Sequence, residues 1–181
     1  MTRDNLSARA ILALAAPVLF MTAAHAQPLK IDDIVVATSI SAAQQATAEK
    51  TARHFYEFWN TGDARLLDQA IAPGFVDHTL PPGRPQGPTG PAYASSHFRM
   101  AVPDLQVEVQ KMVIAGDYVA VHMVFTGHFT GVFGKVRGKG QTIRFIATDL
   151  LKLTDGRVTD NWHIEDNLTL LQSMGIAKLS G

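Results

Sequence analysis

Residues 142–166 read TIRFIATDLLKLTDGRVTDNWHIED, and this stretch decides the fold. It is rich in β-branched and aromatic residues on both sides of a turn signal, which predicts two long strands, Thr142 to Leu153 and Arg157 to Asp166. The triplet Thr154-Asp155-Gly156 suits a three-residue loop with its glycine in the left-handed conformation. The stretch is therefore predicted to form a β-hairpin.

The loop length sets the register of this hairpin. A three-residue loop places Asp149 opposite Asn161. The same register places Ala147 opposite His163, so Asp149 and His163 share one face as diagonal neighbours within reach of a contact. Trp162 then faces away from both. A two-residue loop would reverse this relation, because a shift of one residue moves every side chain to the other face.

Two further strands are expected before the hairpin. Leu105 to Ile114 alternates in polarity, Ala115-Gly116-Asp117 forms a turn, and Tyr118 to Phe129 continues with β-branched and aromatic residues. Gly131 to Gly140 is glycine-rich and basic, and no helix follows it, so we expect a hairpin arm rather than a phosphate-binding loop. The second half of the chain thus predicts four long antiparallel strands.

Helices are expected in the first half. Ala43 to Asn60 carries apolar residues at helical spacing, a second helix runs from its cap Asp63 to Ile71, and a third covers about Ala92 to Ala101. Helices followed by antiparallel strands indicate an α+β fold in which about three helices cover one face of a curved sheet.

The connecting segments are shorter. Phe75 to His78 is predicted to be a short strand, and Leu168 to Gly175 a short amphipathic end. The segment Leu80 to Pro91 holds five prolines and three glycines, so it is expected to be a loop over the edge of the fold, at the mouth of a cavity.

The N-terminal residues 1–26 have the pattern of a secretory signal peptide. Arg3 and Arg9 precede an apolar run, and Ala24-His25-Ala26 is a typical cleavage site. A membrane anchor is the alternative, but the run is shorter than the ~20 residues of a spanning helix. We expect cleavage and a periplasmic or secreted product without a membrane anchor. Residues 27–42 are predicted to be a tether with at most one strand turn, at the apolar patch Ile34-Val35-Val36, and residues 43–181 one domain.

Composition excludes several classes of protein. The 16 Lys and Arg residues balance 16 Asp and Glu residues, so a nucleic-acid-binding surface is not expected. The chain has no cysteine, which excludes thiol nucleophiles, zinc–thiolate sites and disulfides. No phosphate-binding loop or nucleophile-elbow motif is present, and no cofactor is expected.

Seven short motifs are distributed along the chain. They are Phe55-Tyr56-Glu57-Phe58-Trp59-Asn60-Thr61-Gly62-Asp63, Phe75-Val76-Asp77-His78, Gly116-Asp117-Tyr118-Val119-Ala120-Val121, Phe125-Thr126-Gly127-His128-Phe129-Thr130-Gly131, Thr154-Asp155-Gly156-Arg157-Val158, Asn161-Trp162-His163-Ile164-Glu165-Asp166 and Leu170-Leu171-Gln172-Ser173-Met174-Gly175. These motifs resemble those of the SnoaL-like polyketide cyclases and ester cyclases, which share the cone-shaped fold of nuclear transport factor 2 and ketosteroid isomerase. The resemblance covers about Ala43 to Gly175.

The resemblance implies an acid/base site in an apolar cavity. The resemblance implies that Asp166, four residues after Trp162, is the general acid/base. It also implies that Asp149 corresponds to the His or Asp that the family has on the preceding strand. The sequence departs from the cyclase pattern in having Asp at position 149 and its imidazole at His163. Asp149 and His163 are therefore either a catalytic dyad or a buried pair that orders the sheet, and Asp166 is either catalytic or a helix cap.

Other histidines and aromatic residues are candidates for the cavity wall. His122 and His128 lie six apart on one strand, hence on one face, and are expected to line the cavity rather than to hold a metal with Asp149. His78 and His97 are placed at the wall or the rim. The aromatic candidates, which either line the cavity or fill the core, are Phe55, Trp59, Phe98, Phe125 and Phe145.

Three functions remain open. The first is an exported enzyme that performs cofactor-free cyclisation, isomerisation or hydration on a small hydrophobic carbonyl compound. The second is a non-catalytic cone that binds a small apolar ligand. The third is an interaction module, since cones of this kind commonly pair as homodimers through the outer face of the sheet, where Trp162 and Ile164 would then lie.

Overall fold

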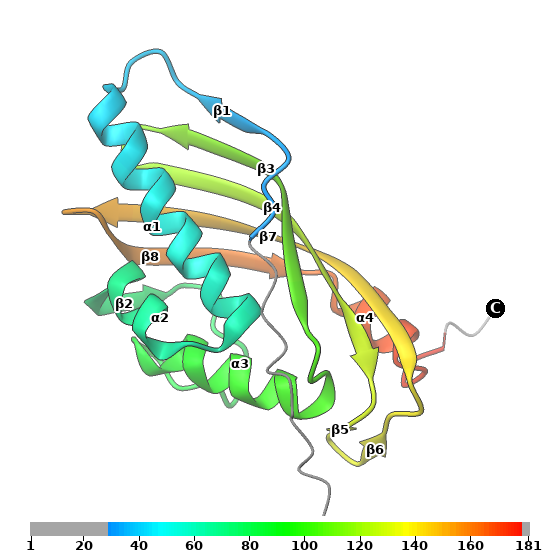
Figure 1. Ribbon diagram of the computed structural model, residues 1–181. Coiled ribbons are helices and arrows are strands. Elements are labelled where there is room, and N and C mark those ends of the chain that lie inside the picture. The colour runs from blue at the N-terminus through cyan, green and yellow to red at the C-terminus, as the bar shows by residue number, and fades with distance from the viewer. Residues whose placement is uncertain (1–28, 179–181) are drawn as a thin grey trace, which may run out of the picture.

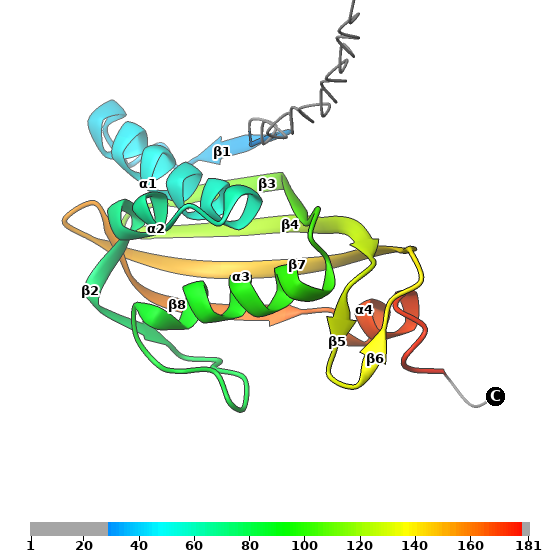
Figure 2. The same cartoon turned by 60° about the horizontal axis from the view of Figure 1, so that its bottom comes forward.

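The computed structural model describes residues 29–178, and the predicted signal peptide 1–26 lies outside this range. Three helices, α1 (Ala42–Thr61), α2 (Ala64–Ala70) and α3 (Thr89–Ala101), cover one face of a curved sheet (Figure 1). The short helix α4 (Asn167–Ser173) lies at the end of the sheet beside a small two-stranded arm (Figure 2). No helix within the described range is long and apolar enough to cross a membrane.

The main sheet has six strands in the order β1-β3-β4-β7-β8-β2. Its centre consists of the four predicted antiparallel strands. Their bounds are Gln106–Ala115 (β3), Tyr118–Phe129 (β4), Gln141–Thr154 (β7) and Arg157–Glu165 (β8). The arm that follows β4 consists of β5 (Val132–Phe133) and β6 (Val136–Arg137), as the glycine-rich segment predicted.

Two edge strands complete this sheet. Residues Ile34–Val36, within the segment predicted to be a tether, form β1 and pair in parallel with β3. The strand predicted at Phe75 to His78 is longer: β2 spans Ile71–Asp77 and pairs in parallel with β8. The sequence did not predict these pairings, because parallel partners far apart in the chain leave no local signal.

The helices begin and end where local chemistry predicts. The N-cap Ser41 accepts a hydrogen bond from the backbone of Gln44, whose side chain in turn accepts one from the Ser41 backbone. Gly62 ends α1 in the left-handed conformation. The third helix begins at Thr89, three residues earlier than predicted. Pro91 lies in its first turn, where the backbone N–H that proline lacks would have no partner within the helix.

The hairpin between β7 and β8 differs from the predicted register. Its loop has two residues, Asp155 and Gly156, both with positive φ, and Thr154 pairs with Arg157. A bulge follows, because Leu153 pairs with Val158 while the next residue back, Lys152, pairs with Asp160. The prediction of a three-residue loop was therefore wrong.

The bulge inserts Thr159 as an extra residue, and this insertion restores the face that the two-residue loop would have reversed. Its hydroxyl donates a hydrogen bond to the Lys152 carbonyl, 3.3 Å away. Beyond the bulge, Asp149 lies directly opposite His163 rather than diagonal to it.

Asn60 joins the end of α1 to the start of β3. Its amide nitrogen donates to the Val107 carbonyl at 3.1 Å, and its amide oxygen accepts from the Val107 backbone N–H. Both residues are buried. The side chain thus acts as a substitute strand partner for Val107.

We predict that Asn60→Ala lowers the free energy of unfolding by about 3 kcal/mol, because it leaves a buried N–H and a buried carbonyl unpaired. Denaturant unfolding measures the change. Lys50→Ala, an exposed position on the same helix, is the control and should stay within about 0.5 kcal/mol of wild type. Equal stabilities of the two variants would contradict the assigned role.

Candidate active site

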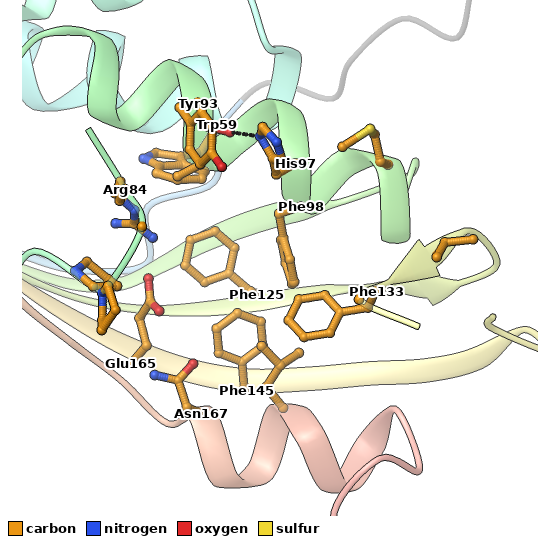
Figure 3. Close-up of a pocket in the computed structure, with 18 residues that line it drawn as sticks. Trp59, Arg84, Tyr93, His97, Phe98, Phe125, Phe133, Phe145, Glu165 and Asn167 are labelled. Atoms are coloured by element: carbon orange, nitrogen blue, oxygen red, sulfur yellow. Dashed lines mark hydrogen bonds between the residues drawn. The ribbon is translucent and has the colours of Figure 1, made fainter. Parts of the chain in front are cut away.

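A cavity of about 640 Å³ lies between α3, the concave face of the sheet, the proline-rich loop and the arm (Figure 3). Its wall is mostly apolar and includes six aromatic side chains. The rings of Phe125 and Phe145 stack at 5.1 Å between centroids, and Trp59 and Phe98 meet them edge-on at 5.9 Å. All four residues were predicted for the wall or the core. Phe55, also predicted, is buried and lines the closed end.

A small inner chamber of about 30 Å³ adjoins this cavity at its closed end. The two spaces share Trp59, Arg84, Phe125 and Glu165 as lining residues. A volume of this size holds one water molecule or the tip of a carbonyl group. The apolar cavity therefore suits the body of a ligand and the chamber suits one polar atom.

His163 lines the inner chamber, and its ring is held by β2. Its Nε2 lies 3.1 Å from Oδ2 of Asp77, and both side chains are more than nine-tenths buried. The other ring nitrogen, Nδ1, lies 3.8 Å from Oε1 of Glu165, which lines both spaces. The predicted contact of His163 with a carboxylate exists, but its partner is Asp77 rather than Asp149.

Asp77 is itself fixed by the loop that follows it. Its Oδ1 accepts hydrogen bonds from the backbone N–H and the hydroxyl of Thr79. Gln86 binds both its backbone N–H and its carbonyl. The carboxylate is thus oriented toward His163 before any ligand binds, as a group that positions an imidazole must be.

Asp149 also lines the chamber, with different partners. Tyr56 on α1 donates to its Oδ2 at 2.8 Å, and Asn161 on β8 donates to its Oδ1 at 3.3 Å. No hydrogen bond joins Asp149 to His163 in the described chain, although they are opposite each other in the ladder. The predicted dyad is therefore two separate pairs, His163 with Asp77 and Asp149 with Tyr56.

Burial dominates the electrostatics of Asp149. It raises the pKa of this carboxyl from 3.8 to about 6, while the hydrogen bond from Tyr56, the charge of His163 and the hydrogen bond from Asn161 act in the opposite direction. Burial together with Asp149 raises the pKa of Tyr56 well above its usual range. Asp149 consequently changes its charge close to neutral pH, which suits a group that gives or takes a proton.

Arg84 and Glu165 stand on the same side of the cavity, between its two parts (Figure 3). Nη1 of Arg84 lies 3.9 Å from Oδ2 of Asp77. Sequence reasoning missed both residues. Glu165 was detectable, since it lies two positions after His163 on one strand and so shares its face, whereas Arg84 lies in an irregular loop whose path the sequence does not predict.

Asp166 is placed away from this chamber. Its Oδ1 accepts from the backbone N–H of Thr169 and its Oδ2 from the Thr169 hydroxyl, so it caps α4. These hydrogen bonds lower the pKa of Asp166 below its usual value. The sequence left two roles open for Asp166, catalysis and helix capping, and the structure shows the helix cap.

Three predicted histidines lie on the outer face of the sheet and do not line the cavity. His122 contacts Thr148 at 3.1 Å, and His128 pairs with Asp104 at 2.6 Å. His78 stacks on Trp162 and pairs with Asp160. His122 and His128 point outward because they alternate along β4 with buried residues that face the helices, and His78 directly follows the buried Asp77 at the end of β2. Within residues 29–178, no three His, Cys, Asp or Glu side chains are grouped to hold a metal ion.

His97 alone among these four lines the cavity, near its mouth. Its Nδ1 lies 2.8 Å from the Tyr93 carbonyl, which can accept only, so this nitrogen carries the proton in the neutral ring (Figure 3). Tyr93 stacks obliquely on the His97 ring. The pair forms a half-exposed rim rather than part of the closed end.

We predict that Asp149→Asn stabilises the protein above pH 6. Below about pH 4 the carboxyl is protonated in both the folded and the unfolded chain; as pH rises through the folded pKa of about 6, the folded protein must hold a buried charge. A shift of this size costs about 3 kcal/mol at neutral pH. The stability gain of the variant should therefore grow between pH 4 and pH 7 in denaturant unfolding experiments.

Asp166→Asn is the control for this pH series. Because the folded-state pKa of Asp166 is lowered, its stabilising contribution is present at neutral pH and is lost on acidification. The stability of this variant relative to wild type should therefore change with pH in the opposite direction. If the difference in unfolding free energy between wild type and Asp149→Asn does not change from pH 4 to 7, burial does not raise the pKa of Asp149.

Comparison with solved structures finds the same architecture in several proteins. A candidate polyketide cyclase from Bacillus cereus is 36% identical, with a TM-score of 0.77 over 84% of this chain and 96% of its own. IdmH, a candidate polyketide cyclase from Streptomyces antibioticus, is 30% identical, with a TM-score of 0.64 over 71% of this chain and 98% of its own.

A protein with the ketosteroid isomerase-like fold from Catenulispora acidiphila is 17% identical, with a TM-score of 0.57 over 71% of this chain and 94% of its own, and this likeness concerns the fold alone. No curated protein matches the chain significantly. The model of the SnoaL-like polyketide cyclases matches residues 49–174, which include every residue of the inner chamber. The chain therefore belongs to the SnoaL-like polyketide cyclase family and has the cone-shaped α+β fold of nuclear transport factor 2 and ketosteroid isomerase.

Proposed function

We propose that the protein is an enzyme that enolises a small hydrophobic carbonyl compound, without a cofactor, as the first step of a cyclisation or isomerisation. The observation that carries this proposal is the placement of a carboxylate-held imidazole, His163, and a buried carboxyl, Asp149, on facing strands at the closed end of an apolar cavity. The family, whose members are polyketide cyclases, supports proton-transfer chemistry of this kind.

His163 is the general base in this proposal. Asp77 is an acceptor for Nε2, so the neutral ring carries its proton there and presents a lone pair on Nδ1. Nδ1 is on the side of Glu165, which lines the cavity. When Nδ1 takes a proton from the carbon beside the carbonyl, the Asp77 carboxylate stabilises the imidazolium that forms.

Asp149 is the proton donor to the carbonyl oxygen. Its pKa of about 6 keeps about a tenth of the carboxyl protonated at pH 7, far more than an ordinary aspartate. The proton that it gives to the enolate oxygen leaves a carboxylate that Tyr56 and Asn161 already stabilise with hydrogen bonds. After rearrangement of the enol, the His163 imidazolium gives its proton to the carbon, and the Asp149 carboxylate takes back the proton of the enol O–H. Both residues thereby regain their starting charges.

The wall of the outer cavity supports a hydrophobic substrate. Aromatic rings line it, and the inner chamber has room for a carbonyl oxygen but not for a ring. Binding therefore directs the carbonyl group into the chamber because the apolar body gains free energy by leaving water, while the polar atom finds partners at the closed end.

We predict that the wild-type protein accelerates hydrogen–deuterium exchange at the α-carbons of 2-tetralone, a neutral bicyclic ketone. Exchange in D2O is followed by proton NMR. His163→Ala should lower the enzymatic rate by at least about 100-fold, because it removes the base. His54→Ala, on the side of α1 away from the cavity, is the matched control and should leave the rate unchanged.

Two outcomes would contradict this mechanism. Exchange in the presence of wild type that equals exchange in buffer would favour a non-catalytic binding cone, particularly if the ketone still raises the melting temperature. A variant His163→Ala that exchanges at the wild-type rate, while Asp166→Asn does not, would transfer the role of the base to Asp166.

We also propose that two copies pair through the outer face of the sheet. Exposed apolar side chains gather there on three neighbouring strands, β4, β7 and β8. These side chains are Tyr118, Ile146, Leu150 and Ile164. Ile164 is 76% exposed. A face on which exposed apolar side chains gather is typical of a protein interface, and pairing through it leaves the cavity, on the opposite face, open.

We predict that light scattering after size exclusion finds a dimer in wild type and a monomer in Ile164→Asp, since a charge in an apolar interface is costly to desolvate. Leu168→Asp, a half-exposed residue on α4 at the end of the sheet, is the control and should remain dimeric. A wild-type monomer at micromolar concentration, or a dimeric Ile164→Asp variant, would refute pairing through this face.

The N-terminal residues support export of the enzyme. The basic residues, apolar run and Ala24-His25-Ala26 of the predicted signal peptide are those of a cleaved secretory sequence. The proposed substrate is then one that is present outside the cytoplasm, and the absence of cysteine makes the chain indifferent to an oxidising compartment.

A further inference from the structure

Asn161 has an unused hydrogen-bond acceptor at the closed end of the cavity. The residue is on β8, it is 5% exposed, and it lines the inner chamber. Its Nδ2 donates to Oδ1 of Asp149 at 3.3 Å, whereas its own Oδ1 has no hydrogen-bond partner within residues 29–178. A buried carbonyl oxygen without a partner is costly, so such an atom calls for an explanation.

The orientation of this amide follows from its neighbour. If the amide were turned over, its oxygen would face the Asp149 carboxylate, and two acceptors cannot share a hydrogen bond. A donor toward Asp149 is therefore required whenever that carboxyl is ionised. Oδ1 of Asn161 is left for a group that the protein does not supply.

The surroundings of Asn161 are rich in acceptors and negative charge. Asp77, Asp149 and Glu165 line the chamber with their carboxyl groups, and Arg84 is the only Lys or Arg among its described lining residues. Because Arg84 already faces Asp77, the chamber is unfavourable for an anion. A neutral group that donates a hydrogen bond fits it best.

We propose that Asn161 is a specificity-determining residue whose Oδ1 accepts a hydrogen bond from an O–H or N–H of the ligand. The site accordingly selects neutral compounds whose one polar atom in the chamber is part of the donor group, as in the enol form of a carbonyl compound, over their methyl ethers and over carboxylates. This inference rests on the proposed function for the identity of the ligand as a carbonyl compound, but the selection itself is a property of binding.

The energetic basis is an exchange of partners. In the free protein the chamber has room for one water molecule, which can donate to Oδ1 of Asn161. A ligand hydroxyl replaces that hydrogen bond when it displaces the water. A methoxy group displaces the water without replacing the bond, so the buried acceptor is left unpaired and affinity falls.

Three bicyclic probes of nearly equal size test the inference by isothermal titration calorimetry at pH 7. We expect 2-naphthol to bind wild type at least about tenfold more tightly than 2-methoxynaphthalene, a difference of about 1.4 kcal/mol. We expect 2-naphthoate to bind at least about tenfold more weakly than 2-naphthol, because its charge meets the three carboxyl groups. These measurements need no variant and so do not depend on whether a variant folds.

Two variants then locate the acceptor. Asn161→Leu, close in size, should reduce the preference for 2-naphthol over 2-methoxynaphthalene to less than about threefold. His54→Ala is the control, because this residue lines neither part of the cavity and the change leaves Oδ1 of Asn161 in place. In His54→Ala the preference should remain at least about tenfold.

The inference is overturned if wild type binds 2-naphthol no better than its methyl ether, if 2-naphthoate binds best, or if Asn161→Leu keeps the full preference. The proposed reaction fails separately. A protein that selects 2-naphthol but does not exchange the protons of 2-tetralone would keep the subsite and lose the enolisation. A protein that exchanges 2-tetralone without the naphthol preference would do the reverse.

Discussion

One extra residue in β8, Thr159, determines which side chains face the cavity. The two-residue loop at Asp155-Gly156 would by itself place Trp162 opposite Asp149 and turn His163 outward, because side chains alternate along a strand. The bulge at Thr159 shifts the register by one and aims Asn161, His163 and Glu165 at the concave face. The whole polar end of the cavity depends on this insertion, since three of its residues lie on the strand that follows it.

The buried carboxyl of Asp149, at the polar end of the cavity, lowers the stability of the fold when it is ionised. Asp149 lies in the middle of the sheet under α1, where burial opposes its ionisation more strongly than Tyr56, Asn161 and His163 favour it. A protein selected for stability alone would place an apolar residue there. The buried carboxyl accords with the proposed role of Asp149 in proton transfer, and the large apolar core around it offsets its stability cost.

In the proposed function, the two parts of the cavity recognise different parts of the ligand. Aromatic rings of the outer part, among them Phe125 and Phe145, favour any flat apolar molecule and discriminate little. In the proposed function, discrimination belongs to the small chamber, where His163 and Asn161 present acceptors and Asp149 presents a proton donor in fixed positions. Asp77 supports this arrangement from the edge strand β2, whose parallel pairing with β8 brings a residue 86 positions away against the His163 ring.

The sequence by itself determined the elements that local chemistry controls. The helices over 42–61 and 64–70, the long strands and the arm follow from side-chain periodicity, caps and turn residues, and the motifs at 55–63 and 161–166 indicated the family. Phe125 and Phe145 were also predictable as part of the core or wall, because their strand periodicity places them on the buried face.

Only the tertiary structure decided which polar residues meet. Asp77 reaches His163 through a parallel pairing, Tyr56 reaches Asp149 across the helix–sheet interface, and Arg84 comes from a loop without periodicity. His122 and His128 shared a face as predicted, but that face is the outer one, since strand alternation does not say which side the helices cover. Contacts between residues distant in the chain depend on register and packing, and local sequence carries no record of either.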